Sequence, residues 1–186
     1  MPHLRNLVLV VSVLLGLATD EGFVRVGGDV PMPSRVHFVE PEYPPIAGQV
    51  VPQVVGIVIL EVGLNEEGRP IDIKVLYGVP LLDAAAIDAV KQWRFQPTLI
   101  SGKPTRVAFR EVVDVFPDAG SRSRYFARMV QDRKEQKALR LIAADRLRTG
   151  GWRQKHVLDG LRKATIDADS DISAAAGRAL QALGGR

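Results

Sequence analysis

With 186 residues, 46% of them apolar, the chain can form one ordinary domain or two small ones, which excludes an intrinsically disordered protein. The absence of cysteine excludes thiol chemistry and thiolate metal sites. The net charge of +4 hides an asymmetry, because residues 1–120 hold ten Lys/Arg against fourteen Asp/Glu, whereas residues 121–186 hold fifteen against seven. This split predicts two modules with different surfaces. The basic residues of the second module form either a solvated helix face or a surface that meets phosphate or lipid headgroups.

The first segment has the pattern of a signal peptide. Arg5 precedes an apolar run, Leu7–Ala18, that is much shorter than the roughly 20 residues of a membrane-spanning helix. Gly16 and Ala18 place small residues where a cleavage after Ala18 needs them. We therefore predict that residues 1–18 are a signal peptide, with a short uncleaved anchor or a buried segment as the alternatives. The protein is then expected in the periplasm or cell envelope, associated with the inner membrane if the segment is uncleaved.

Residues 19–40 predict an extended lead-in, because their many Gly and Pro residues rule out a long helix. We expect this lead-in to pair briefly at Arg35–Val39. A short helical turn is expected after Tyr43, since proline is tolerated at a first helical position. Gly56 then opens a strand that continues to Leu64, with apolar residues on both faces at its start, as in a covered central strand.

A hairpin is predicted at Asn65–Gly68, where Gly68 can take the positive φ of such a connection. The strand Ile71–Leu76 alternates like a half-exposed strand. The following helix has apolar residues at steps of three and four and cannot continue past Pro97. A last strand is predicted over Arg106–Phe116, with a bulge near Glu111 where the alternation shifts. The residues expected to be buried by the helix are Leu82, Ala85, Ala86, Ala89, Val90 and Trp93.

The order of these elements predicts an α+β fold in which one helix packs on a three-stranded antiparallel sheet. Six motifs occur in order: Tyr-Pro, a glycine before the first strand, Asn-x-x-Gly, Leu-Asp-x-Ala-Ala, Trp-Arg-Phe-x-Pro and Gly-Lys-Pro. In this order and spacing, residues from about Pro41 to Phe116 resemble the carboxy-terminal domain of the TonB family. We assign residues 41–117 to this domain.

The resemblance implies a function in which a segment of an outer-membrane receptor adds as an extra strand to the sheet. By the family's topology, the accepting edge is the last strand, here Arg106–Asp114. Arg106 and Arg110 fit equally well as partner contacts and as charges that protect an edge from unwanted pairing. Glu40 stands where the family often has Gln near the bound peptide. The implied partner-binding residues are Glu40, Tyr43, Arg106, Val107, Ala108, Phe109 and Arg110.

Residues 121–186 predict an all-α tail of about three helices. The first is a long amphipathic stretch that includes Phe126 and Ala143, and Gly150-Gly151 ends it. The piece Val157–Gly184 is similar to a HEAT-type repeat, although Ser173 replaces the arginine that is common after that repeat's acidic turn. Since solenoids generally need about three repeats, we expect the tail to pack on the sheet domain, with docking of a partner as the alternative.

Catalytic chemistry is not expected. His3, His37 and His156 lie far apart without metal-ligand spacing, and the sequence has neither a nucleophile elbow nor a phosphate loop. Asp83 and Asp88 are not at a spacing that places two carboxylates on one helix face. We predict no enzyme, no cofactor and no metal.

Two functions remain, both of them binding functions. The first is a TonB-like envelope protein that binds a receptor peptide, or another envelope protein, in connection with transport across the outer membrane. The alternative is an exported scaffold, which could be a homo-oligomer, without a transport role. Coupling to the family's proton-driven ExbB and ExbD partners is not expected, because the apolar run is short and holds no ionisable residue. Nucleic acid is not expected as a partner, since the basic tail lacks interleaved aromatic residues.

Overall fold

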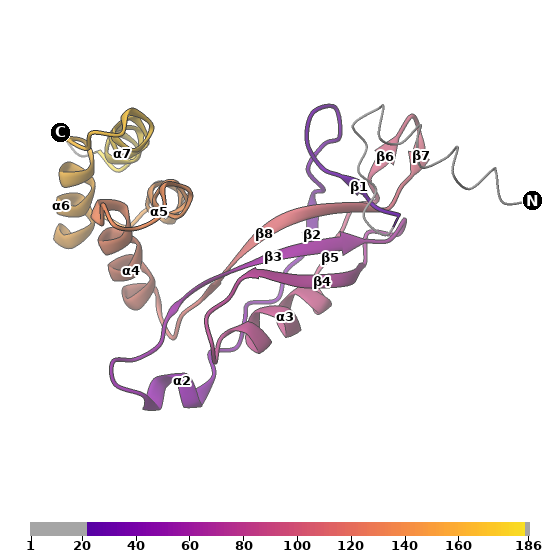
Figure 1. Ribbon diagram of the computed structural model, residues 1–186, viewed down its shortest axis with the longest axis horizontal. Helices are drawn as coiled ribbons and strands as arrows, with labels where there is room; N and C mark the ends of the chain where they lie inside the picture. The colour runs from indigo at the N-terminus through magenta and orange to yellow at the C-terminus, as the bar shows by residue number, and fades with distance from the viewer. Residues whose placement is uncertain (1–21, 185–186) are drawn as a thin grey trace, which may run out of the picture. The chain divides into compact units, whose positions relative to one another are not determined.

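The computed structural model describes residues 22–184, so the predicted signal peptide lies outside the described residues. The chain divides into two compact units at the boundary between Val115 and Phe116. The first unit holds the sheet, and the second holds helices (Figure 1). None of the helices in residues 22–184 has the length and apolar character needed to cross a membrane.

The central sheet of the first unit has four strands in the order β1-β8-β3-β4. Its strands are β1 (Val24–Arg25), β3 (Gly56–Leu64), β4 (Pro70–Tyr77) and β8 (Val107–Val115). β3 pairs antiparallel with β4 and β8, whereas β1 pairs parallel with β8. The predicted three-stranded antiparallel sheet is therefore wrong. The added strand comes from the lead-in, where a two-residue pairing is too short to produce a period of two in the sequence.

The core lies between one face of this sheet and the helix α3 (Asp83–Gln92). The four alternate side chains of β3 that face α3 are fully buried, as the period of two predicts. Trp93, at the end of α3, is also buried, and its Nε1 donates to the Val39 carbonyl at 2.7 Å. The hydroxyl of Tyr43 donates to the Val54 carbonyl at 2.8 Å. The Trp93 bond fastens the end of the lead-in to the domain, and the Tyr43 bond joins the start of the domain to the segment before β3. The buried β3 side chains are Val58, Leu60, Val62 and Leu64.

The hairpin between β3 and β4 forms at the predicted residues. The side chain of Asn65 accepts hydrogen bonds from the backbone N–H groups of Glu67, at 3.1 Å, and of Arg69, at 2.8 Å. Gly68 takes a φ of +77°, the left-handed conformation that favours glycine. The turn chemistry read from the sequence is thus confirmed.

Short elements complete the first unit. The helix α2 (Pro45–Gln49) follows Tyr43, and β2 (Arg35–His37) pairs antiparallel with β5 (Arg94–Phe95). The pairing expected at Arg35–Val39 is confirmed at its first residues. A small hairpin is formed by β6 (Leu99–Ile100) and β7 (Lys103–Pro104).

The last strand carries no bulge. The register between β3 and β8 runs without a shift from the pair Gly56–Val115 to the pair Leu64–Val107. Glu111 stands opposite Leu60, and its carboxylate meets the Arg35 guanidinium at 3.8 Å. The predicted bulge near Glu111 is wrong, because the alternation continues through the two apolar residues that follow it: Val113 is buried, and Val112 on the other face is only partly buried.

As far as residue 184, the tail forms four helices, α4 (Ala119–Gln131), α5 (Lys137–Gly150), α6 (Lys155–Ala164) and α7 (Ser170–Ala182). The prediction of about three helices is wrong, because the expected long first helix is broken between Gln131 and Lys137. At this break the Asp132 side chain accepts from the Lys134 backbone N–H at 3.0 Å, a local bond that competes with helix continuation. α4 packs on α5 and α6, and α7 packs on α5 and α6, which gives two stacked helical hairpins.

A buried ion pair joins the tail's helices. Arg140 is 5% exposed, and its guanidinium donates both to the Val130 carbonyl and to the Asp167 carboxylate, the latter at 2.6 Å. The Asp167 carboxylate also accepts from the Asp169 backbone N–H at 2.9 Å. The hydrogen bond from Arg140 lowers the pKa of Asp167 from 3.8 to about 2. The pair therefore connects the end of α4, the start of α5 and the turn between α6 and α7.

Candidate functional site

The outer side of β8, the edge predicted from the sequence, is already partly paired. One side of β8 is hydrogen-bonded to β3 along its whole length, and the other side meets β1 at Val107 and Ala108. The Val24 N–H donates to the Arg106 carbonyl, and the Val26 N–H donates to the Ala108 carbonyl, both at 2.9 Å. The chain's own lead-in therefore occupies the beginning of this edge.

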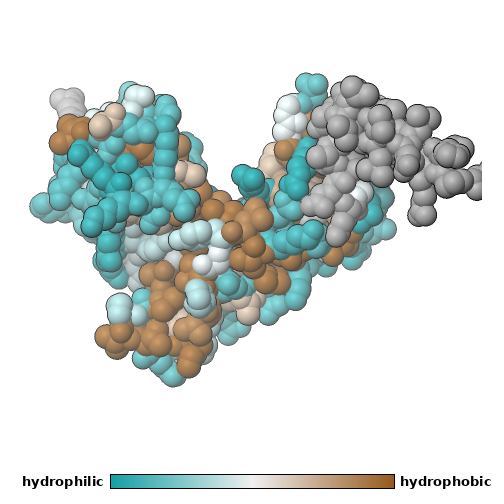
Figure 2. Space-filling model, viewed as in Figure 1, coloured by the Kyte–Doolittle hydropathy of each residue, from teal (hydrophilic) through white to brown (hydrophobic). Residues whose placement is uncertain are grey.

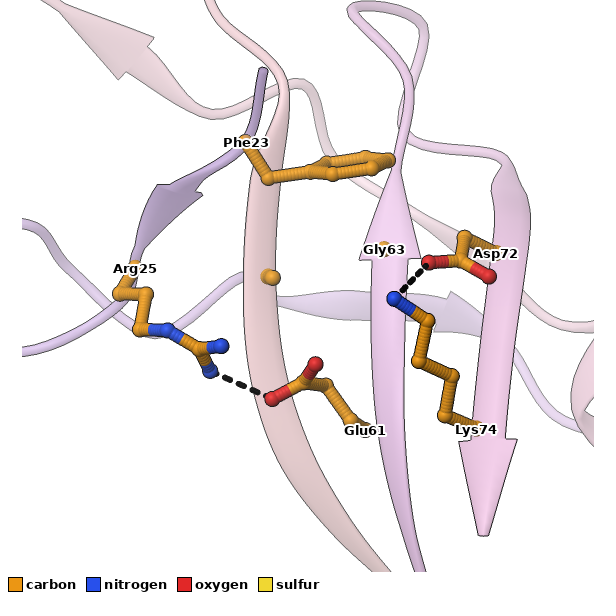
Figure 3. A pocket seen from close by; sticks show the side chains of 7 residues that line it. Phe23, Arg25, Glu61, Gly63, Asp72 and Lys74 are labelled. Carbon is orange, nitrogen blue, oxygen red and sulfur yellow. Dashed lines mark hydrogen bonds and ion pairs between the residues drawn. The ribbon is translucent and has the colours of Figure 1, made fainter. Parts of the chain in front are cut away.

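Side chains of the lead-in alternate between the two faces of the sheet. Val24 and Val26 are half-buried and pack against the core. Phe23 and Arg25 lie on the opposite face, over the β3 residues Gly63 and Glu61 (Figure 3). The lead-in at this point thus behaves as a strand beyond its two paired residues.

The ring of Phe23 fills a place that only a glycine leaves open. Phe23 is 5% exposed, and a Cβ atom at Gly63 would lie 2.8 Å from two atoms of its ring, closer than real contacts allow. The Arg106 guanidinium lies 4.4 Å from the ring centroid, a cation–π distance. The ring therefore contacts both the bare backbone of β3 and a cation from the segment that leads into β8.

The second side chain of the lead-in makes an ion pair. The Arg25 guanidinium donates to the Glu61 carboxylate, and the Glu61 side chain is only 13% exposed (Figure 3). Beside them, Lys74 and Asp72 of β4 pair at 3.4 Å. The pocket lined by these residues retains about 10 Å³, near the lower limit for one water molecule. Phe23 and Arg25 thus nearly fill this part of the sheet face.

The residues from Arg106 to Arg110, which were predicted to contact a partner, differ from one another in burial and in what they contact. The side chains of Val107 and Phe109 belong to the core, where Phe109 meets Phe95 edge to face. Ala108 is buried and paired with β1, and Arg106 packs on Phe23. Arg110 is exposed, two residues past the last pairing with β1.

The other two predicted partner-binding residues, Glu40 and Tyr43, lie away from the strand edge. Tyr43 packs against the core, and its hydroxyl serves the hydrogen bond to Val54. Glu40 lines a surface groove of about 450 Å³ together with Glu42 and, from α3, Asp88. No β8 residue lines this groove, so the structure does not join Glu40 to the strand edge.

Sequence reasoning missed Phe23, Arg25, Glu61 and Gly63. Two weak signals could have found them. The run from Phe23 to Val26 has the composition of a short strand, with aromatic and β-branched residues. A glycine inside a strand, such as Gly63, often marks the close approach of another group. Neither signal says which strand the lead-in joins.

Two other features of the described residues are not strand-accepting sites. Figure 2 shows an apolar surface at α2 and the loop after it, where Ile46, Val50 and Val51 are exposed. This surface belongs to a short helix and a loop, so it presents no row of strand main-chain groups. Across residues 22–184, no cluster of three or more His, Asp or Glu side chains could hold a metal ion.

Comparisons with known proteins agree with the resemblance read from the motifs. Residues 39–113 match the family model described as Gram-negative bacterial TonB protein C-terminal. Protein TonB of Vibrio cholerae serotype O1 (strain ATCC 39315 / El Tor Inaba N16961) is 37% identical over 68 residues, which are 36% of this chain and 27% of that protein. The predicted resemblance to the TonB carboxy-terminal domain is confirmed. The chain spans about a quarter of the length of this curated relative.

Among solved structures, the chain is similar to the solution NMR structure of the Pseudomonas aeruginosa TonB CTD. The identity is 22%, and the alignment covers 50% of this chain and 95% of that chain with a TM-score of 0.36.

Proposed function

We propose that this protein is a TonB-like cell-envelope protein that binds an extended segment of an outer-membrane receptor by strand addition to β8. The binding serves energy-dependent transport across the outer membrane, and the protein acts from the periplasm. The observation that supports the proposal is the pairing of β8 with β1, because it means that the outer side of β8 accepts a parallel strand.

The geometry of β8 favours addition along its length. β1 pairs with two residues of a nine-residue strand. The carbonyls of Arg106 and Ala108 face β1, so by alternation the backbone of Arg110 also faces away from β3. An incoming segment would bond to these main-chain groups, and its alternate side chains would meet the two sheet faces. In this proposal the protein has no catalytic residue, and Arg110 lies beside the incoming segment.

The alternative is a scaffold in which the tail binds a partner. A groove of about 450 Å³ runs along the tail helices and is lined by α5 residues, including Leu141 and Arg148, and by Ala175 and Arg178 of α7. Stacked helical hairpins of this HEAT-like kind form extended binding surfaces when they repeat. The groove supports an assembly function without a transport role.

A pair of variants at Arg110 tests strand addition. Proline at residue 110 removes a backbone N–H that faces away from β3 and leaves the ladder between β3 and β8 in place. Alanine at the same residue removes the side chain and keeps the N–H. We expect Arg110→Pro to lower the capture of outer-membrane receptors from an envelope extract by about tenfold or more, while Arg110→Ala, which keeps the backbone N–H, lowers it much less.

The measurement is quantitative mass spectrometry of proteins captured on the tagged full chain, with thermal unfolding of both variants as the folding control. Equal capture by the two variants would contradict strand addition at β8. Capture of the chain itself, with no receptor among the enriched proteins, would instead support the scaffold.

A further inference from the structure

The strand that occupies β8 is small and is held at few places. β1 has two residues, and the Val24 and Val26 N–H groups donate to the carbonyls of Arg106 and Ala108. Beyond these bonds, it is held by the ring of Phe23, the ion pair of Arg25 and the packing of Val24 and Val26 against the core. Segments with few contacts and short hydrogen-bonded runs open at low free-energy cost. A strand as short as β1 is therefore expected to leave the edge at a lower free-energy cost than the longer strands of the sheet.

The first contact defines a subsite for a flat ring. The ring of Phe23 lies against the backbone at Gly63, where even one methyl group would come within 2.8 Å of it. The Arg106 guanidinium lies over the ring, and its buried Nε makes no hydrogen bond within the described part of the chain. A cation beside a ring gains energy from the aromatic face, which an aliphatic side chain does not offer. The subsite thus favours an aromatic residue.

The second contact defines a subsite for a cation. Glu61 is mostly buried beneath Arg25, so a strand without a base at this point would leave a carboxylate with poor access to water. Phe23 and Arg25 are two residues apart, which is the spacing that places both side chains on one face of a strand. The residue between them and the residue after them are valines directed toward the core.

We propose that these two subsites select the partner: the segment that adds to β8 runs parallel to it and carries an aromatic residue followed, two positions later, by a basic residue. Phe23–Val26 is the resident occupant that this segment replaces. The inference rests on the proposed function, since it specifies the peptide that strand addition at β8 accepts.

Replacement follows from the geometry, because one edge position holds only one strand. The Arg106 and Ala108 carbonyls that accept from the lead-in are the ones a parallel partner would use. A partner segment therefore binds only the fraction of molecules in which the lead-in has left, and its apparent affinity falls by that fraction. Loosening the lead-in should tighten partner binding.

A labelled peptide copying residues 22–30 provides the probe, and fluorescence anisotropy with the full chain measures its binding. Phe23→Ala removes the ring of the resident strand and leaves the subsites intact, so we expect the peptide to bind about tenfold tighter or more than to the original chain. Gly63→Ala also expels the resident ring, but it closes the ring subsite, so the peptide should not bind. If the two substitutions acted only by loosening the lead-in, both variants would bind the peptide more tightly than the original chain.

The cation subsite is tested by exchanging charges in the Phe23→Ala background. A peptide with Glu in place of its Arg should bind at least about tenfold more weakly than the original peptide. Adding Glu61→Lys to the chain should reverse this preference. A peptide with Ala in place of its Phe should bind no variant. Should Phe23→Ala not fold, amide exchange of Val24 and Val26 in the original chain, with excess peptide, shows displacement directly.

Several results would overturn the inference. These are a Phe23→Ala chain that binds the peptide no tighter than the original chain, equal binding of the Phe and Ala peptides, and self-association of Phe23→Ala without peptide binding. If Arg110→Pro still lowers receptor capture in those cases, strand addition at β8 stands and only the proposed selectivity for an aromatic and a basic residue fails. If the peptides bind as expected but no receptor is captured, the subsites stand and the receptor is not the partner.

Discussion

Two glycines of the central strands and their hairpin set how closely other segments can approach. Gly63 leaves space for a side chain, that of Phe23, and Gly68 leaves space for a main-chain group. At Gly68 the carbonyl oxygen of Phe95 would lie 2.1 Å from an added Cβ atom, and the Phe95 N–H donates to the Gly68 carbonyl at 3.0 Å. The hairpin thus touches the segment that follows α3.

Replacement of Gly68 by alanine is expected to destabilise the first unit by about 3 kcal/mol or more, since the left-handed φ and the overlap with Phe95 each cost about 1–3 kcal/mol. Gly102 is a matched control, because it has the same φ of +77° and nothing within 4 Å of an added Cβ. Gly102→Ala should cost only the conformational part, about 1 kcal/mol. Denaturant unfolding measures both, and equal losses would show that the Phe95 contact contributes nothing.

The strands and the helix of the first unit differ in how far the sequence predicts them. β3, β4 and α3 have enough residues for their periods to be read, and the turn residues from Asn65 to Gly68 fix the hairpin. β1 could not be predicted, because Val24 and Arg25 form a strand only where β8 presents an open edge and Gly63 a space. Likewise, the charged run after Gln131 resembles the exposed face of a continuous helix.

The candidate site, too, could be predicted from the sequence only in part. Its main-chain part, the edge of β8, follows from the order of elements and the family's topology. Its side-chain part comes from Phe23 and Arg25, which are distant in sequence from Glu61 and Gly63 and meet them only in the folded sheet. The apparent shift of alternation at Glu111 also misled the sequence reading, since the partner of this partly buried carboxylate, Arg35, lies in the lead-in.

The turn between α6 and α7 gives the tail a predicted pH dependence. The pKa of Asp167 is about 2 in the folded chain and 3.8 ordinarily, so the carboxylate stabilises the tail above about pH 4. This contribution is lost as the pH falls from about 4 to about 2. We expect Asp167→Asn to be less stable at neutral pH and to lose less stability than the original chain over this range.

Thermal unfolding, followed by the helical circular dichroism signal at several pH values, measures how steeply the stability of the tail falls with pH. Asp145→Asn is the control, because Asp145 forms an exposed ion pair with Arg148 within one helix, and such pairs contribute little. If Asp167→Asn and the original chain show the same slope between pH 4 and pH 2, the buried pair does not set the tail's acid sensitivity.

At the scale of the whole molecule, the chain combines two units with opposite charge. The excess of basic residues lies after residue 120, and the sheet with its strand edge lies before Phe116. Packing of the tail on the sheet domain stays a prediction. Each unit has buried apolar residues of its own, such as Trp93 in the first and Phe126 in the second. The strand edge and the tail groove are therefore separate candidate surfaces, and a partner's footprint can distinguish them.

Hydrogen exchange of the full chain, with and without a captured outer-membrane receptor, locates that footprint. We predict that the receptor slows exchange of the backbone amide of Arg110 and speeds exchange at Val24 and Val26, because a new strand replaces β1 on β8. Protection confined to the groove beside Glu40 and Asp88, or to the tail helices, with β8 and β1 unchanged, would contradict strand addition at this edge.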